Sequence, residues 1–201
     1  MSTRVHILMF DQVEVLDFAG PYEVFTTASR VHARSHADMP ALFTVACVSR
    51  DGQRVQARAG LRVLPELGFD NAPACDLLLV PGGVVGGALA CATTRSWIAQ
   101  QAASAHTVAS VCTGVFLLAA SGVVHTDTVT THWEDVADLR QQFPALTVLE
   151  GPRWVDNRRL ITSAGISAGI DMSLHLVGRL GGQQLAERTA RQMDYPWQAH
   201  A

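Results

Sequence analysis

Lysine is absent from the 201-residue sequence, so all fifteen basic residues are arginines. This absence excludes Schiff-base catalysis, an anchored pyridoxal phosphate and the lysine of a phosphate-binding P-loop. Charge is also sparse, since 18 acidic and 15 basic residues give a formal net charge of −3 and no basic run exceeds Arg158-Arg159. We therefore expect no nucleic-acid partner.

Long apolar runs are also missing. The longest, at residues 115–120, is far shorter than the roughly 20 residues that a membrane helix needs. The four cysteines show no CxxC spacing, and no signal peptide precedes the first apolar run. We expect a soluble cytoplasmic protein with reduced thiols and no membrane contact, folded as a single domain over residues 1–201.

Short apolar segments rich in β-branched residues alternate with helical patterns along the chain. The expected strands are residues 5–10, 43–48, 77–80, 108–111 and 160–163. The expected helices are residues 21–33, 93–105, 113–121, 133–143, 168–180 and 183–193. This alternation predicts an α/β fold with a doubly wound, mainly parallel sheet and helices on both faces. A hairpin at residues 55–65 is expected at the sheet edge.

The predicted site lies beyond the carboxyl ends of the strands, where ligands bind in open α/β sheets. There Cys112 stands between a buried strand and a helix, as the serine of a hydrolase elbow does. The helix terminus should lower the pKa of this thiol and make it nucleophilic. The alternative is an ordinary small buried residue. Cys47, Cys75 and Cys91 have no acid or histidine placed to activate them, and we interpret them as structural.

Glycines at residues 82–87 follow another predicted strand, but their spacing fits neither GxGxxG nor a Walker loop. They let the backbone pass close to Cys112. An N–H of Gly82 or Gly83, together with that of Thr113, could form an oxyanion-type pocket. A plain glycine-rich turn is the alternative.

Two further residues can have either a chemical or a structural role. Asp17 either caps the following helix or faces Cys112 as an acid or base. His132 either serves as a base or begins a helix. The histidines are not spaced as a metal site, and we expect neither a metal nor a cofactor.

With these segments assembled, the sequence resembles the DJ-1/PfpI superfamily, within it the isocyanide hydratases and the amidase-like domains of AraC-type regulators. The resemblance rests on residues 15–21, 80–83, 110–114, 130–133 and 162–171. It implies a flavodoxin-like fold of the class I glutamine amidotransferase type and a homodimer. It also implies a nucleophilic Cys112, Asp17 as its acidic partner and Thr113 beside the thiolate.

By this resemblance the small-molecule substrate is an isocyanide, to which water is added to give an N-substituted formamide. Trp133 and Ile166, with Phe18, are candidates for an apolar wall of the substrate pocket. Two features depart from related families: Thr113 stands where PfpI-type proteases have histidine, and no late His-x-Glu pair of an amidotransferase is present.

Two alternatives remain open. One is a ligand- or redox-sensing module without turnover, and the other is glyoxalase or deglycase activity on small aldehydes with the same thiolate. A regulator would need a further DNA-binding domain, so the length of the chain favours an enzyme.

Overall fold

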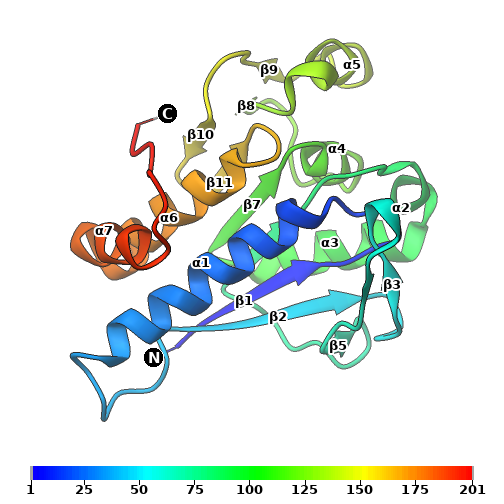
Figure 1. Cartoon of the computed structure of the whole chain (residues 1–201). Helices are drawn as coiled ribbons and strands as arrows, with labels where there is room; N and C mark the ends of the chain where they lie inside the picture. The colour runs from blue at the N-terminus through cyan, green and yellow to red at the C-terminus, as the bar shows by residue number, and fades with distance from the viewer. Residues whose placement is uncertain (1, 201) are drawn as a thin grey trace.

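The computed structural model describes residues 2–200 and has a seven-stranded sheet between two groups of helices (Figure 1). Neighbouring strands are parallel except for the first two in spatial order, which are antiparallel. The strands in spatial order are β10 (Trp154–Asn157), β11 (Leu160–Ser163), β7 (Thr107–Val111), β6 (Leu77–Val80), β1 (Thr3–Leu8), β2 (Phe43–Ser49) and β5 (Leu67–Gly68). The α/β fold predicted from the sequence is confirmed.

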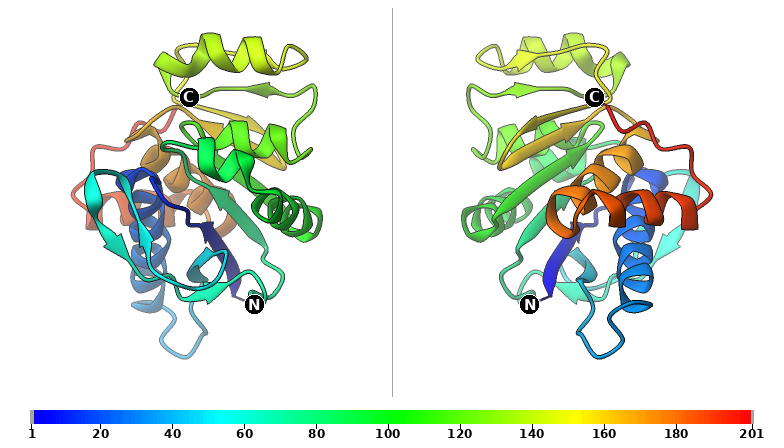
Figure 2. Two further views of the ribbon diagram at one scale, coloured as in Figure 1. Left: turned by 90° about the vertical axis from the view of Figure 1, so that its right-hand side faces the viewer. Right: turned by 90° about the vertical axis from the view of Figure 1, so that its left-hand side faces the viewer.

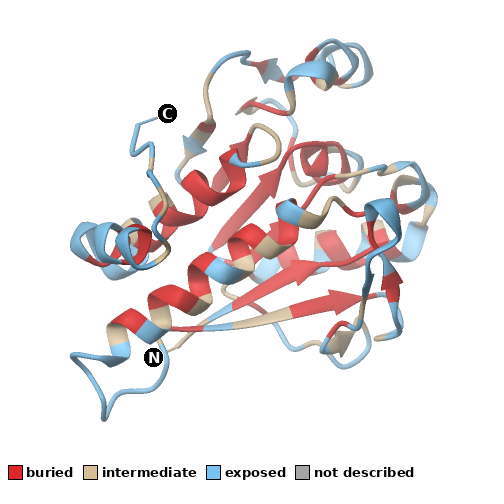
Figure 3. Cartoon of the chain, viewed as in Figure 1, coloured by how far each residue is buried: buried red, intermediate tan, exposed pale blue. Residues whose placement is uncertain are grey.

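Helices cover both faces of this sheet (Figure 2). One face carries α1 (Val15–Ala33), α6 (Ala168–Gly181) and α7 (Gln183–Gln192), which pack on one another. The other carries α2 (Gly86–Ala90), α3 (Ala92–Ser104) and α4 (Gly114–Ala120). Every residue of the central strands β6, β7 and β11 is therefore buried (Figure 3). This explains why their sequences are continuously apolar or small rather than alternating.

The remaining elements lie outside the main sheet. They are β3 (Val55–Gln56), β4 (Arg62–Val63), β8 (Thr128–Val129), β9 (Thr147–Val148), α5 (Val136–Gln142) and the 3₁₀ turns η1 (Arg58–Gly60) and η2 (Trp133–Asp135). The hairpin predicted at residues 55–65 forms as β3 and β4, but as a two-stranded sheet of its own. The edge strands of the main sheet are β5 and β10 instead. Among residues 2–200, no helix combines the length and apolarity needed to cross a membrane.

The first helix differs from the prediction. It begins at Val15 rather than at Pro21, which lies inside it. Glu14 is its N-cap, and the Glu14 carboxylate accepts a hydrogen bond from the Val15 N–H at 3.2 Å. Asp17 is therefore not a cap. It lies in the first turn, fully buried, and faces the interior of the protein.

The carboxyl ends of the parallel strands β1, β6, β7 and β11 lie at the same end of the sheet. From β1 the chain crosses to β2 on one side and later returns to β6 on the other, so the strand order reverses between β1 and β6. Such a reversal opens a crevice above the strand ends. The residues predicted to carry the chemistry follow these strands.

Candidate active site

Cys112 occupies a sharp turn between β7 and α4. Its φ is +56°, a left-handed conformation that costs energy for a residue with a side chain and is typical of functional turns. Two hydrogen bonds hold the turn in place. The Cys112 N–H donates to the Ser163 carbonyl at 3.1 Å, and the Thr131 hydroxyl donates to the Cys112 carbonyl at 2.9 Å. The predicted elbow is present.

Two glycines allow other segments to pass close to this turn. A Cβ on Gly82 would lie 2.6 Å from the Thr113 nitrogen and 2.9 Å from the Cys112 Cβ. A Cβ on Gly165 would lie 3.0 Å from the Cys112 Sγ and would overlap the His132 ring. Larger residues would displace the thiol or the imidazole. The loops after β6 and β11 therefore close around the sulfur because they carry glycine.

The carboxyl group of Asp17 reaches the same point from α1. Its Oδ2 accepts a hydrogen bond from the Gly82 N–H at 3.1 Å. Its Oδ1 is buried and has no hydrogen-bond partner among the described residues. The Cys112 thiol and this carboxyl each shift the pKa of the other, as neighbours do. The oxygen Oδ1 is thus free to accept or donate a proton.

The backbone N–H groups of the glycine loop are already engaged. Gly82 donates to Asp17, and Gly83 donates to the Thr113 hydroxyl oxygen at 2.9 Å. The Thr113 hydroxyl in turn donates to the Gly83 carbonyl at 2.9 Å. Gly82 and Gly83 therefore position Asp17 and Thr113, and neither N–H is free for an oxyanion. The Thr113 N–H is different, since it faces the Cys112 sulfur and lowers its pKa.

Burial controls the protonation of the pair. Burial is the main cause that raises the pKa of Asp17 to about 7, although the Gly82 N–H opposes it. Burial and the charge of Asp17 raise the pKa of Cys112 to about 12. The prediction of a lowered Cys112 pKa is therefore wrong. The N–H of Thr113 does act in the expected direction, but desolvation of the thiol outweighs it.

The His132 ring lies close to Gly165, as the Cys112 sulfur does. His132 is the N-cap of η2, and its Nδ1 accepts a hydrogen bond from the Glu134 N–H at 3.3 Å. The Asp135 carboxylate lies 3.6 Å from the same nitrogen. His132 thus both begins a helical turn and reaches the site, so the two interpretations of the sequence are compatible.

The three candidates for an apolar wall differ in position. Trp133 is 70% exposed and borders a hollow of about 110 Å³ together with Gly165. Ile166 is half-buried in the loop after β11. Phe18 is buried in the hydrophobic core, so it supports α1 rather than lining the hollow. The apolar side of the site is therefore built from the loops after β8 and β11.

A family model for the DJ-1/PfpI family matches residues 3–179. The chain belongs to the DJ-1/PfpI family. Isonitrile hydratase from Pseudomonas putida is 35% identical over 196 residues, which are 97% of this chain and 79% of the relative. The transcriptional regulator GbdR from Pseudomonas aeruginosa is 30% identical over 95% of this chain, which spans only half of the regulator.

Solved structures agree with this assignment. A ThiJ/PfpI family protein from Pseudomonas syringae has a TM-score of 0.84 at 28% identity, over 100% of this chain and 80% of that one. DJ-1beta from Drosophila melanogaster has a TM-score of 0.82 at 17% identity, over 98% of this chain and 100% of that one. The latter likeness shows the DJ-1 fold alone.

Some functional neighbours in this DJ-1/PfpI protein were not predicted. Thr131 anchors the elbow carbonyl, and Asp135 faces His132. Both lie within three residues of His132 in the sequence, and this proximity was the only signal that could have identified them.

The interpretation of Cys91 as a structural thiol needs correction. Cys47 and Cys75 are buried with pKa values raised to about 12, but the pKa of Cys91 is lowered to about 7 by the Thr94 hydroxyl and amide and by Arg50.

Proposed function

We propose that this DJ-1/PfpI protein is a cysteine-dependent hydratase that adds water to an isocyanide and releases an N-substituted formamide. The observation that carries the proposal is the buried Asp17–Cys112 pair at the elbow, with a carboxyl oxygen left free beside the thiol. The similarity to isonitrile hydratase over nearly the whole chain supports the choice of substrate class.

The pair supplies one proton and one nucleophile. Between about pH 7 and 12 it holds a single proton, which resides on the sulfur or on the carboxyl oxygen. The sulfur attacks the terminal isocyanide carbon, and the proton moves through Asp17 to that same carbon, giving a thioimidate on Cys112. The Thr113 N–H stabilises the sulfur anion during the attack.

Water then resolves the thioimidate. Its oxygen bonds to the imidate carbon, and one of its protons moves to the nitrogen. The carbon–sulfur bond breaks, the remaining hydroxyl proton returns through Asp17 to the Cys112 sulfur, and the formamide leaves. The reaction consumes one water, needs no oxidant or reductant, and restores the pair. The hollow beside Trp133 and Gly165 receives the organic group of the isocyanide.

The test is formamide production from an aryl isocyanide by the wild type beside Cys112→Ser and Asp17→Asn. We expect turnover in the wild type and a loss of at least about 10³-fold in kcat for Cys112→Ser, because the nucleophile is removed. Cys47→Ser, at a buried thiol outside the site, is the matched control and keeps its activity. Absence of formamide with folded wild type rejects the hydratase.

A ligand-sensing module is the second candidate, favoured by the 30% identity to GbdR over 95% of this chain. In that case the pocket at Cys112 holds an effector and performs no turnover. Calorimetry with an isocyanide separates the two functions. A sensor retains saturable binding in the wild type and in Cys112→Ser without any product, whereas a hydratase converts the ligand only when the thiol is present.

A further inference from the structure

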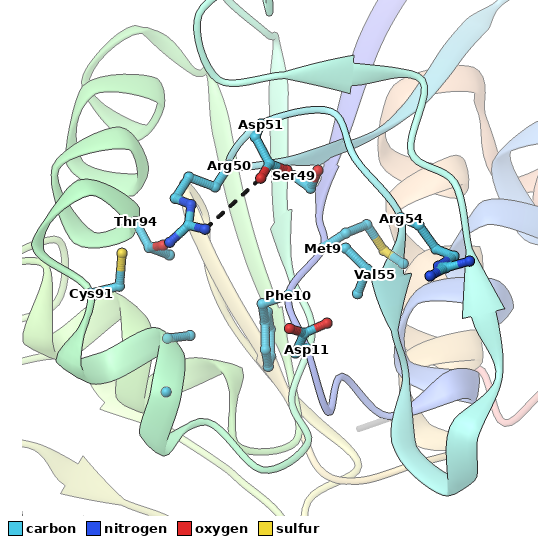
Figure 4. A pocket seen from close by; sticks show the side chains of 12 residues that line it. Met9, Phe10, Asp11, Ser49, Arg50, Asp51, Arg54, Val55, Cys91 and Thr94 are labelled. Carbon is cyan, nitrogen blue, oxygen red and sulfur yellow. Dashed lines mark ion pairs between the residues drawn. The ribbon is translucent and has the colours of Figure 1, made fainter.

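A second cavity, of about 270 Å³, lies at the ends of β1 and β2, opposite the start of α3 (Figure 4). This volume lies just below the roughly 300 Å³ at which sites for drug-sized ligands begin, so it suits a smaller molecule. None of its lining residues belongs to the Asp17–Cys112 pair. The polar lining consists of Asp11, Ser49, Arg50, Asp51, Arg54 and Thr94, with Cys91 beside Thr94.

Cys91 lines the cavity and is the N-cap of α3. Figure 4 shows its sulfur on the same side of the cavity as Thr94 and Arg50. Thr94 is only 5% exposed, so its hydroxyl is fixed beside the sulfur, whereas Cys91 itself is partly exposed. The Thr94 hydroxyl, its amide and Arg50 all favour the thiolate. Partly exposed thiols whose thiolate form is stabilised by neighbouring donors are the reactive ones in proteins.

The charged groups of the cavity are balanced. Arg50 and Arg54 stand on opposite sides of it in Figure 4, and Asp11 and Asp51 contribute two carboxylates. Arg50 and Asp51 are 3.9 Å apart, with side chains 64% and 55% exposed, so this loose pair leaves both groups able to bind a ligand. A simple anion would be repelled by the carboxylates. A zwitterion, with a carboxylate and an ammonium group, matches both signs.

We propose that Cys91 is a site of reversible S-thiolation by small zwitterionic disulfides, of which cystine is the simplest. The Cys91 sulfur attacks one sulfur of the disulfide. A new sulfur–sulfur bond forms, the old one breaks, and the departing half leaves as a thiolate that takes a proton from water. Cys91 is oxidised to a mixed disulfide and the departing half is reduced, so no further oxidant is needed. This chemistry is independent of Cys112.

Two properties of the site favour this exchange. A thiol with a pKa near the ambient pH is the best attacking group, because it combines a high thiolate fraction with good nucleophilicity. Cys112 is protonated near neutral pH and buried, and Cys47 and Cys75 are buried as well. Cys91 should therefore react first, although it is not the nucleophile of the elbow.

The experiment incubates the reduced full chain with cystine at pH 7.5 and follows adducts by intact mass and peptide mapping. We expect one cysteinyl adduct on Cys91, formed equally fast in Cys112→Ser and absent in Cys91→Ser. Bis(2-hydroxyethyl) disulfide, which carries no charge, is the matched probe. The wild type should prefer cystine, and the exposed Arg50→Gln and Arg54→Gln variants should each reduce that preference by about two- to fivefold.

Two results would overturn the proposal. One is a first adduct on any cysteine other than Cys91, which would show that the thiol at α3 has no special reactivity. The other is a preference for cystine that survives both arginine substitutions unchanged, which would show that the cavity does not recognise the zwitterion. Because neither readout involves formamide, failure here is distinct from failure of the proposed hydratase.

Discussion

At the residue scale, Asp17 and Cys112 are buried side by side, and burial disfavours the charged form of each. The sequence identified both residues, but from the sequence only the helix terminus beside Cys112 could be weighed. The depth of burial depends on the glycine loops that close over the pair, and these come from distant parts of the chain. The direction of the thiol pKa shift was therefore predicted wrongly.

The pH profile of kcat/KM follows from this protonation. Below about pH 7 Asp17 is protonated in addition to the thiol, and the pair can no longer take the thiol proton. We expect kcat/KM for an aryl isocyanide to fall about tenfold per pH unit below 7 and to be flat from about pH 7.5 to 9. Steady-state assays between pH 5.5 and 9 check this. Activity that rises as the pH falls below 7 would contradict it.

Stability should depend on pH through the same carboxyl. Its pKa in the folded chain is about 7, well above the ordinary value of 3.8 for an aspartate, so the native state binds a proton that the unfolded state has lost. The wild type should lose up to about 4 kcal/mol of unfolding free energy between pH 4 and 7. Asp17→Asn should lose less, as urea denaturation can measure.

The exposed Asp38→Asn is the matched control for this measurement. This variant removes an exposed carboxyl and keeps the buried Asp17. The free energy of unfolding of Asp38→Asn should therefore change with pH as that of the wild type does. Identical curves for wild type and Asp17→Asn would mean that Asp17 titrates normally in the folded protein.

At the element scale, the site depends on how closely the loops after β6 and β11 approach the elbow. The buried strands β6, β7 and β11 could be predicted because each is a short apolar or small-residue run. The two-residue strands β8 and β9 could not, because so few residues give no periodic signal. The loop that carries His132 to the sulfur is therefore a product of tertiary packing.

Gly165→Ala tests this close approach. The added methyl would overlap the His132 ring and lie 3.0 Å from the Cys112 Sγ, so the thiol or the imidazole must move. A displacement of this kind should lower kcat by about 100-fold. Gly86→Ala is the control, because a Cβ there meets nothing within 4 Å. Equal activity of the two variants would show that the loop accommodates a methyl group at residue 165 without displacing the thiol or the imidazole.

At the scale of the whole molecule, the alternation of apolar runs and helices was sufficient to predict the sheet and its two helical layers. The crevice follows from the strand order, since β1, β6, β7 and β11 end at one edge. The cavity at Cys91 was not predictable, because Arg50 and Arg54 follow β2 whereas Cys91 precedes α3, and only the fold brings these two segments together.

The homodimer implied by the family resemblance is a prediction at this scale. Leu16, Val84 and Trp133 are 38%, 52% and 70% exposed, and each adjoins a site residue in the sequence. Apolar side chains of this size are commonly covered at interfaces. We expect a dimer in analytical ultracentrifugation at micromolar concentration. A sharp monomer boundary at that concentration would contradict it.

The covalent step at Cys112 is the centre of the proposed function. The most direct test is acid quenching of the wild type during turnover of an aryl isocyanide, followed by mass spectrometry of the peptide that contains Cys112. The proposal predicts a transient mass increase equal to one isocyanide on Cys112 and on no other residue. It also predicts that the adduct forms far more slowly in Asp17→Asn, which can no longer take the thiol proton. Formamide production without any adduct on Cys112, or with an adduct only on another cysteine, would contradict the account.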